Sequence, residues 1–202
     1  ASTAGATIKK PVLELGGSDP AVILADADVA AAAAACTTSR LLNAGQSCIA
    51  AKRFVVVDEI RQEFEQRFVE TMRRRHMGDP LDPEVNVGPQ ARHDLRDELH
   101  DQVSKSIAAG ARCLLGGEVP EGDGAYYPPT VLADVRPGMP AYDEELFGPV
   151  GVVYRVSSEE EAVQIANDTS YGLGSYVFTT DADQASRIAD RIDAGMVYIN
   201  LV

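Results

Sequence analysis

The stretch PVGVVYRVSSEEEAVQIANDTSYGLGSYVFTT (149–180) holds two apolar segments separated by an amphipathic one. Residues 149–156 and 174–180 are rich in β-branched and aromatic side chains, which favour strands. Between them, Ser157 or Ser158 can cap a helix over 159–168, with acidic residues in the first turn where the helix dipole favours negative charge. A strand, a helix of this length and a second strand indicate a βαβ unit with parallel strands.

The same alternation extends along the rest of the chain. Further strands are expected at 11–15, 21–25, 53–57, 111–115 and 195–202, with an extended proline-containing segment at 126–132. Helices are expected from Asp28 to about Leu42, from Glu59 to about His76, over 91–109, and from Asp181 to about Ile192. We therefore predict an α/β fold in which helices cover both faces of an open, mostly parallel sheet, with no domain boundary within 1–202.

Composition narrows the classes of function. The 202 residues include 31 acidic and 18 basic side chains, for a net charge of −13, which disfavours a nucleic-acid partner. No apolar run has the length of a membrane span, and the N-terminus lacks the apolar region of a signal peptide. The three cysteines form neither a disulfide pattern nor a zinc-like cluster with histidine, so we expect a cytoplasmic protein without a metal. The basic run 73–76 is typical of a solvated helix end, and the three histidines of surface positions.

One of the cysteines lies in a distinctive setting. In NAGQSC (43–48), Cys48 follows a glycine-containing turn after a helix, where local N–H groups or a bound cationic cofactor could lower the pKa of the thiol and make it a nucleophile. The alternative for a lone cysteine is simple packing in the core. That second interpretation suits Cys36, within an alanine-rich helix, and Cys113, within a strand.

A carboxylate stands in an unusual place in VLELGG (12–17). Glu14 lies between two leucines on a segment expected to be a buried strand, and burial raises the pKa of a carboxyl group towards the range of a general base. Gly16 and Gly17 allow another group to approach the backbone closely. The alternative is an acid that faces water at the end of a strand.

A third segment, EELFGPV (144–150), leads from acidic residues directly into a strand. Loops at strand ends bind ligands in α/β proteins. Glu145 could accept a hydrogen bond from a ribose hydroxyl, and the Phe147 ring could flank a flat cofactor. The alternative places Phe147 in the core.

Together, LELGG, NxGQxC and EExFGPV resemble the three signature segments of the aldehyde dehydrogenase superfamily, in the family's order and at its spacing. The resemblance extends over essentially all of 1–202. Because family members are more than twice this long, it implies that 1–202 is the catalytic, thiol-bearing domain. The coenzyme-binding domain and the C-terminal oligomerisation segment would then lie outside it, and we expect the isolated chain not to oxidise aldehydes.

The resemblance implies a mechanism and a role for each residue of the motifs. Cys48 would attack the aldehyde carbonyl and pass through a thiohemiacetal to a thioester, which water activated by Glu14 would hydrolyse. An asparagine amide upstream of Ala1 would help the Cys48 N–H to hold the oxyanion. Asn43 and Gln46 would shape the loop.

The resemblance also implies how coenzyme and substrate would be held. The coenzyme would be NAD or NADP, with Glu145 on the nicotinamide-side ribose, Phe147 at the nicotinamide region, and Leu15 and Gly16 among the binding residues. Ser47 and Ile49 would line the substrate tunnel. The whole enzyme would be a homodimer or homotetramer that acts on a small aldehyde.

Within the superfamily, LELGGSDP and GQSCIAAKRF are most similar to bacterial succinate-semialdehyde dehydrogenase-type enzymes. Members of that group carry an arginine six residues before the nucleophile, where this chain has Leu42, with Arg40 two residues away. A redox-partner cysteine found in some members is Ala50 here. A related semialdehyde or a broad range of aldehydes therefore stays open as the substrate. A CoA-acylating enzyme, a cysteine hydrolase with a histidine partner, and a non-catalytic structural fragment stay open as different classes of function.

Overall fold

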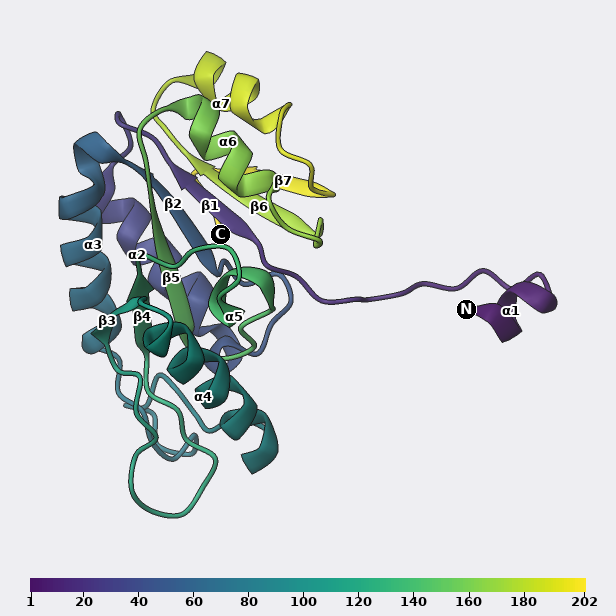
Figure 1. The fold of residues 1–202 in the computed structure, drawn as a ribbon, viewed down its shortest axis with the longest axis vertical. Coiled ribbons are helices and arrows are strands. Elements are labelled where there is room, and N and C mark those ends of the chain that lie inside the picture. Colours follow the sequence, from purple (N-terminus) through teal and green to yellow (C-terminus); the bar gives the residue numbers. More distant parts are fainter.

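Seven strands form one sheet in the computed structural model, which describes residues 1–202 (Figure 1). The strand order is β3-β4-β5-β2-β1-β6-β7, and every neighbouring pair is parallel except β3 and β4. The strands are β1 (Pro20–Ile23), β2 (Arg53–Val57), β3 (Arg112–Leu115), β4 (Thr130–Ala133), β5 (Val150–Val156), β6 (Gly174–Phe178) and β7 (Met196–Ile199). The predicted α/β fold with an open, mostly parallel sheet is confirmed.

Three of the seven α-helices begin at a capping side chain. The α-helices are α1 (Ser2–Ala6), α2 (Val29–Leu41), α3 (Asp58–Arg73), α4 (His93–Ala108), α5 (Pro140–Asp143), α6 (Glu159–Asn167) and α7 (Ala182–Ala189), with a short 3-10 turn, η1 (Leu42–Gly45), after α2. Asp28, Ser158 and Asp181 each accept a hydrogen bond from a backbone N–H in the first turn of the helix that follows. Ser158, rather than Ser157, is therefore the cap of α6. None of these helices combines the length and apolar character that crossing a bilayer requires.

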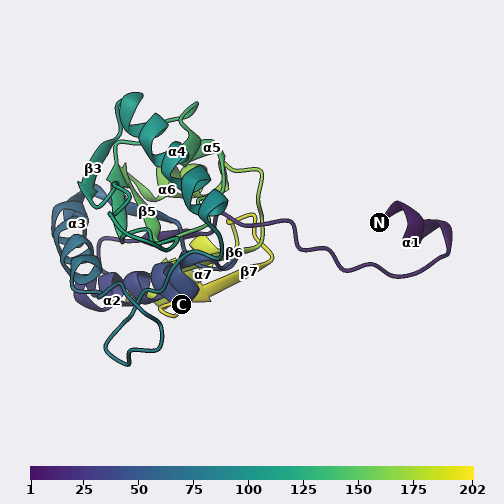
Figure 2. The ribbon, with the colours of Figure 1, turned by 90° about the horizontal axis from the view of Figure 1, so that it is seen from below.

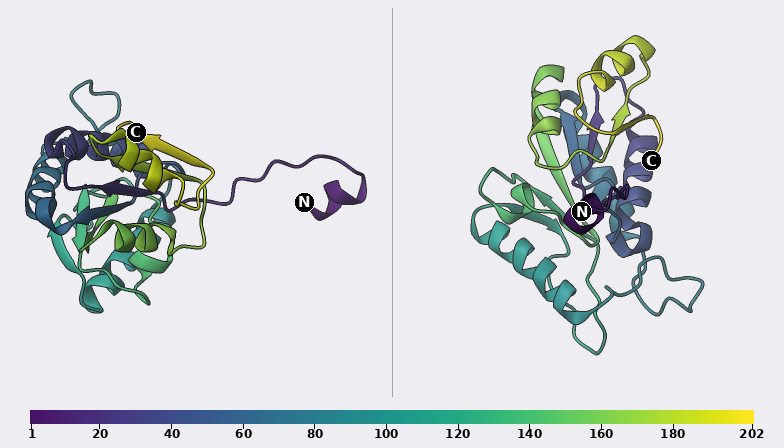
Figure 3. Two further views of the ribbon diagram at one scale, coloured as in Figure 1. Left: turned by 90° about the horizontal axis from the view of Figure 1, so that it is seen from above. Right: turned by 90° about the vertical axis from the view of Figure 1, so that its right-hand side faces the viewer.

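Alternate residues of the strands supply two hydrophobic layers, one on each face of the sheet. Phe54 and Val56 of β2 pack with α2 and α3, whereas Val55 and Val57 pack with α4, α6 and α7 on the other face. Figures 2 and 3 show the sheet between these helices, with α2 and α3 on one side and α4 and α6 on the other. Both layers are closed by apolar side chains, as the prediction of helices on both faces required.

One predicted strand is wrong. Residues 11–15 have no regular structure and belong to an exposed segment that leads away from the sheet to α1 (Figure 1). The apolar side chains of Val12 and Leu15 are 91% and 78% exposed. A strand needs a neighbouring strand to satisfy its N–H and C=O groups, and no strand of this chain lies beside the segment.

The antiparallel pair of β3 and β4 departs from the βαβ pattern for a topological reason. No helix connects the two strands, and a parallel connection requires a crossover of a dozen or more residues that is usually helical. Gly116 and Gly117 instead begin a loop with positive φ angles of 68° and 86°, and this loop returns the chain alongside itself.

The aromatic cluster under α3 gives a test of this packing. Phe68 is fully buried, with its ring centroid 4.5 Å from that of Phe54 and 5.6 Å from that of Phe64. We expect Phe68→Ala to lower the free energy of unfolding by about 3–5 kcal/mol, because it removes apolar contacts and leaves a cavity. Denaturant unfolding of the variant measures the loss. The exposed Gln66→Ala on the same helix should change stability by about 0.5 kcal/mol or less. A loss for Phe68→Ala as small as that of Gln66→Ala would contradict the packing described.

Candidate active site

The three motifs meet at one edge of the sheet because each of them directly precedes a parallel strand. Gly17 lies before β1, Cys48 before β2, and Glu145 before β5. The register of the sheet pairs Pro20 with Arg53. It also pairs Arg53 with Val152, so the preceding segments lie side by side. The candidate site is therefore at the amino-terminal ends of the strands, opposite to the carboxyl-terminal edge that open α/β sheets commonly use.

The loop that carries Cys48 is held in shape by its own amides. Asn43 and Ala44 have positive φ angles of 51° and 54°, which turn the chain sharply after α2. The Asn43 side chain donates to the Gln46 carbonyl at 3.0 Å, and the Gln46 side chain donates back to the Asn43 carbonyl at 3.2 Å. The Gln46 Oε1 also accepts from the Ala91 N–H at 2.8 Å. These bonds give both amides the loop-shaping role that the resemblance implied.

Two glycines let the motif backbones touch. A Cβ atom on Gly45 would lie 2.1 Å from the Gly148 carbonyl oxygen, and one on Gly17 would lie 2.4 Å from the Cys48 carbonyl oxygen. Gly45 also has a positive φ of 76°. Because real Cβ atoms do not approach other atoms so closely, these positions require glycine. The contacts join the Cys48 loop to the Glu145 loop on one side and to the Glu14 segment on the other.

The Cys48 thiol is half-buried, and its pKa is raised rather than lowered. Loss of solvation is the main cause, and the neighbouring Glu14 carboxylate adds to it. The backbone N–H groups of Ile49 and Cys48 act in the opposite direction, as the sequence led us to expect, but they do not prevail. The expectation of a lowered thiol pKa is therefore wrong for the chain by itself.

The other two cysteines differ from each other. Cys36 is fully buried in α2, where burial raises the pKa of its thiol, and its predicted packing role is confirmed. Cys113 lies on β3 as expected but is exposed, and its Sγ lies 3.2 Å from the Leu115 carbonyl oxygen. The prediction that Cys113 packs in the core is wrong.

Glu14 is exposed and lies on no strand, so its predicted burial is wrong. Its Oε1 accepts a hydrogen bond from the Gly16 N–H at 3.1 Å. The carboxylate is nevertheless close enough to Cys48 to raise the pKa of the thiol. The structure thus brings together the two residues to which the sequence assigned the chemistry. Glu14 reaches Cys48 from an exposed segment rather than from the buried strand that was predicted.

Glu145 and Phe147 lie at a small hollow beside this edge. With Leu95, Glu98, Leu99 and Gln102 they line a volume of about 210 Å³. Phe147 is 41% exposed, so the alternative that placed it in the core is wrong. The Glu145 Oε1 accepts from the Gly17 N–H at 3.1 Å, and a Cβ on Gly16 would lie 2.5 Å from Oε2. A partly exposed carboxylate seated against glycine backbone beside an open aromatic ring fits the ribose and flat ring of a dinucleotide.

The comparisons with known proteins agree with this geometry. Residues 1–202 match the model of the aldehyde dehydrogenase family over their whole length. The chain belongs to the aldehyde dehydrogenase family. Among its curated relatives, it is 52% identical over 197 residues to the succinate semialdehyde dehydrogenase [NAD(P)+] Sad of Escherichia coli. It is 50% identical over 200 residues to the succinate-semialdehyde dehydrogenase [NADP(+)] of Deinococcus radiodurans. These alignments cover 98% and 99% of the chain but only 43% and 42% of the relatives.

Solved structures of aldehyde dehydrogenases have the same fold. The succinic semialdehyde dehydrogenase of Streptococcus pyogenes, solved in complex with NADP+, superposes with a TM-score of 0.94 at 39% identity. That match covers 99% of this chain and 44% of the other. The lactaldehyde dehydrogenase of Escherichia coli also gives a TM-score of 0.94, at 38% identity, and covers 99% of this chain and 42% of the other.

The sequence did not reveal a buried lysine next to the Cys48 loop of this member of the aldehyde dehydrogenase family. Lys52 is 1% exposed, and its Nζ donates to the carbonyls of Ser47, Cys48 and Ala50 at 3.1, 2.9 and 3.2 Å. The same nitrogen lies 3.4 Å from the Glu145 Oε1. Burial, and then the nearby charge of Arg40, lower the pKa of Lys52 to about 8. The only signal in the sequence is the basic pair Lys52 and Arg53 at the start of the otherwise apolar strand 53–57.

Two more charged side chains lie buried at this edge. Arg40 has no exposed surface and donates to the Gly45 carbonyl at 2.6 Å, and burial lowers its pKa to about 9. Asp19 accepts from the Gly174 N–H at 3.2 Å, and burial raises its pKa to about 6. Arg40 therefore supports the loop from within the fold. Leu42 and Ile49, in contrast, are 57% and 42% exposed, and Ser47 is half-buried.

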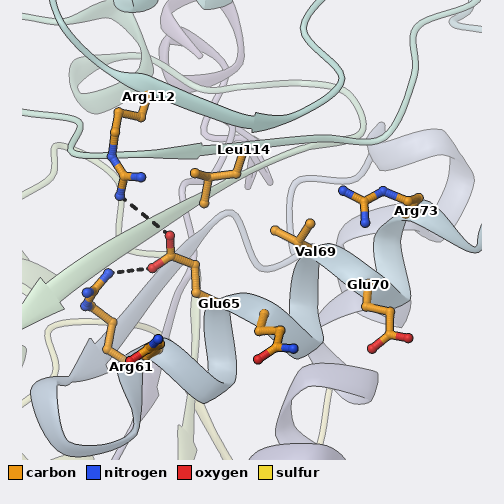
Figure 4. Close-up of a pocket in the computed structure, with 9 residues that line it drawn as sticks. Arg61, Glu65, Val69, Glu70, Arg73, Arg112 and Leu114 are labelled. Carbon is orange, nitrogen blue, oxygen red and sulfur yellow. Dashed lines mark hydrogen bonds and ion pairs between the residues drawn. The ribbon is translucent and has the colours of Figure 1, made fainter.

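A wider hollow than the one beside Glu145 lies elsewhere, between α3 and the edge strand β3 (Figure 4). It measures about 780 Å³ and is wide open to solvent. Its centre is Glu65, which pairs with Arg61 at 2.5 Å and with Arg112 at 3.6 Å. None of the motif residues lines it, so its size does not connect it with the chemistry of Cys48.

The proximity of Glu14 to Cys48 predicts the effect of removing one charge. Because the Glu14 carboxylate disfavours the neighbouring thiolate, Glu14→Gln should lower the pKa of Cys48 and speed its alkylation at neutral pH. The pH dependence of iodoacetamide incorporation at Cys48, followed by peptide mass analysis, measures this shift. Glu121→Gln, on the exposed loop between β3 and β4, is the matched control and should leave the profile unchanged. An unchanged or higher thiol pKa in Glu14→Gln would contradict the unfavourable effect of the Glu14 carboxylate on the thiolate.

Proposed function

We propose that the protein containing this chain oxidises an aldehyde to a carboxylic acid with NAD(P)+, through a covalent intermediate on Cys48. The observation that carries the proposal is the convergence of Cys48, Glu14 and Glu145 at one sheet edge, where backbone contacts at Gly17 and Gly45 join their loops. The chain spans 42–43% of the length of the curated relatives named above, so the activity is proposed for the whole protein. Residues 1–202 would be its catalytic domain, and the rest would supply the coenzyme-binding domain and the oligomerisation segment.

In the proposed reaction, the Cys48 thiolate attacks the carbonyl carbon and forms a thiohemiacetal. The Cys48 N–H donates to the resulting oxyanion, together with an asparagine amide from outside this chain. NAD(P)+, with Glu145 and Phe147 among the residues that would hold it, would supply the acceptor for the hydride that the thiohemiacetal carbon loses as it becomes a thioester. Glu14 then takes a proton from water, the water oxygen adds to the thioester carbon, and Cys48 leaves as a thiolate. Glu14 is exposed and next to the thiol, as a base that works on water requires.

The coenzyme side of the site is assigned to the hollow beside β5. Glu145 would accept hydrogen bonds from the nicotinamide-side ribose through Oε2, since Oε1 is engaged by the Gly17 N–H. Phe147 would contact the nicotinamide region. Leu15 and Gly16 would flank the same space, with Gly16 leaving room for the carboxylate. The relatives named for NAD(P)+ or NADP+ support either coenzyme.

Succinate semialdehyde is the substrate we propose, because the relatives at 50–52% identity are named for it. The residues at the thiol leave the recognition of its carboxylate to other parts of the protein. Leu42 is exposed where the family's arginine would stand, and Arg40 is wholly buried. Ser47 and Ile49 would line the tunnel. A related semialdehyde or a broader range of aldehydes is the alternative.

Different reaction classes fit the site less well. The charges and hydrogen bonds that act on the Cys48 thiol come from Glu14 and from local backbone, not from a histidine, which disfavours a cysteine hydrolase. A base beside the thiol favours hydrolysis of the thioester over its transfer to CoA. We propose that the protein is cytoplasmic, because its three cysteines in residues 1–202 are unpaired, as in a reducing compartment. We also propose that the whole enzyme is a homodimer or a homotetramer.

Removal of the two proposed catalytic groups separates the two chemical steps. In the full-length protein, assayed against a panel of aldehydes that includes succinate semialdehyde, Cys48→Ala should abolish turnover. Glu14→Gln should release one burst of reduced coenzyme per active site and then stall, because the thioester forms but is not hydrolysed. Rapid-mixing absorbance at the reduced nicotinamide band measures both.

Cys113→Ser is the matched control, since Cys113 is the other accessible thiol, and it should retain wild-type turnover. Activity retained in Cys48→Ala would refute the assignment of the nucleophile. Steady turnover without a burst in Glu14→Gln would refute the assignment of the base.

A further inference from the structure

We propose that Lys52 is a positioning residue that orients the two peptide groups on either side of Cys48 and, with the same ammonium group, holds Glu145 in place. The consequences for turnover rest on the proposed function, whereas those for the thiol do not. Lys52 touches no reacting atom, so its effect would pass through the backbone of the nucleophile loop and through the Glu145 carboxylate.

The contacts of Nζ are confined to these groups. It donates to the carbonyl oxygens of Ser47 at 3.1 Å, Cys48 at 2.9 Å and Ala50 at 3.2 Å. The Glu145 Oε1 lies 3.4 Å away. Four acceptors around one buried ammonium leave no donor of Lys52 for solvent. The side chain therefore spans the gap between the nucleophile loop and the loop before β5.

Because the peptide bond is planar, the contacts of Lys52 with these carbonyls also fix the directions of the N–H groups that follow them. In a planar trans peptide, the C=O and the following N–H point in opposite directions. When Lys52 draws the Ser47 carbonyl inward, the Cys48 N–H must point away from Lys52. The Cys48 carbonyl fixes the Ile49 N–H in the same manner. These are the two N–H groups that lower the pKa of the Cys48 thiol, so their direction matters to the nucleophile.

The link to Glu145 joins the thiol to the coenzyme side. The Oε1 that forms the ion pair with Lys52 also accepts the Gly17 N–H at 3.1 Å, so an ion pair and a hydrogen bond hold one oxygen and leave Oε2 beside Gly16. Lys52 alone thus orients both the N–H donors at the Cys48 thiol and the Glu145 carboxylate that would accept from the ribose. Removal of the Lys52 charge should therefore change both the reactivity of the thiol and the position of Glu145. Substitution of an ordinary core residue should lower stability without a specific effect on either.

Burial explains why an ammonium group is needed here. Without it, the carbonyl oxygens of Cys48 and Ala50 would lose their hydrogen-bond donor, and that of Ser47 would keep only the Ala50 N–H at 3.2 Å. Buried carbonyls without a donor are costly, so the loop would be expected to reorient. The other charged groups that face Lys52 are Arg40, which opposes its charge, and Glu145 and Asp19, which favour it. The two carboxylates therefore help to keep this lysine charged in a site with little access to water.

The experiment uses the full-length protein in a Cys113→Ser background, which removes the other accessible thiol of residues 1–202, and peptide mass analysis follows alkylation at Cys48 itself. Lys52→Met keeps the length of the side chain but removes the charge and the donors. We expect its Cys48 to show a higher thiol pKa and to react with iodoacetamide about tenfold more slowly at neutral pH. We also expect kcat to fall about tenfold and KM for the coenzyme to rise, with the aldehyde KM little changed.

Phe68→Leu is the matched control, because it weakens the core without contact to the site. It should lower the Tm but leave both the alkylation profile and the coenzyme KM as in the parent. Lys52→Gln, which keeps amide donors on a shorter side chain, should lie between the parent and Lys52→Met. If Lys52→Met does not fold, the alkylation profile and the coenzyme KM of Lys52→Gln test the proposal instead.

A Lys52 variant with the alkylation profile of Phe68→Leu would overturn the proposal. The alkylation arm needs neither aldehyde nor coenzyme. If the parent protein oxidised no aldehyde, the proposed function would fail, yet the thiol pKa of the Lys52 variants would still test the positioning role.

Discussion

Strands β1, β2 and β5 run side by side in the same direction, with Pro20 paired to Arg53 and Arg53 to Val152. In a parallel sheet this register aligns the segments that precede the strands as firmly as the strands themselves. The Glu14 segment, the Cys48 loop and the Glu145 loop are such preceding segments. Residues more than a hundred positions apart therefore meet without any helix or loop having to reach across the molecule.

The same constraint explains why buried cations gather at this edge. A helix that follows a parallel strand runs back along the sheet, so its carboxyl end, with unpaired carbonyls and partial negative charge, lies at the amino-terminal edge. Arg53 donates to the carbonyls of Ile165 and Ala166 in the last turn of α6, at 2.7 and 2.8 Å. Arg40 stands in the last turn of α2 and bonds to Gly45 just beyond it. Lys52 completes the set on the carbonyls around Cys48.

The sequence predicted those parts of the fold that depend on local patterns. The strand 53–57 and the capping roles of Asp28 and Asp181 follow from side-chain type and spacing, and the structure agrees at each of them. The predicted strand 11–15 is wrong because apolar residues alone do not provide a neighbouring strand. Lys52 and Arg40 were missed because charged residues are seldom buried, and only the tertiary arrangement supplies the carbonyls that make their burial tolerable.

The charges around Cys48 also affect the stage of the reaction at which its thiol ionises. The thiol faces the Glu14 carboxylate and is partly desolvated, and both of these disfavour the thiolate. Two backbone N–H groups favour it but are outweighed in the chain alone. A positively charged nicotinamide ring beside the thiol would add the missing stabilisation. Under the proposed function, the nucleophile would then gain its charge mainly when the coenzyme is in place, which limits the reaction of Cys48 with electrophiles before the hydride acceptor has bound.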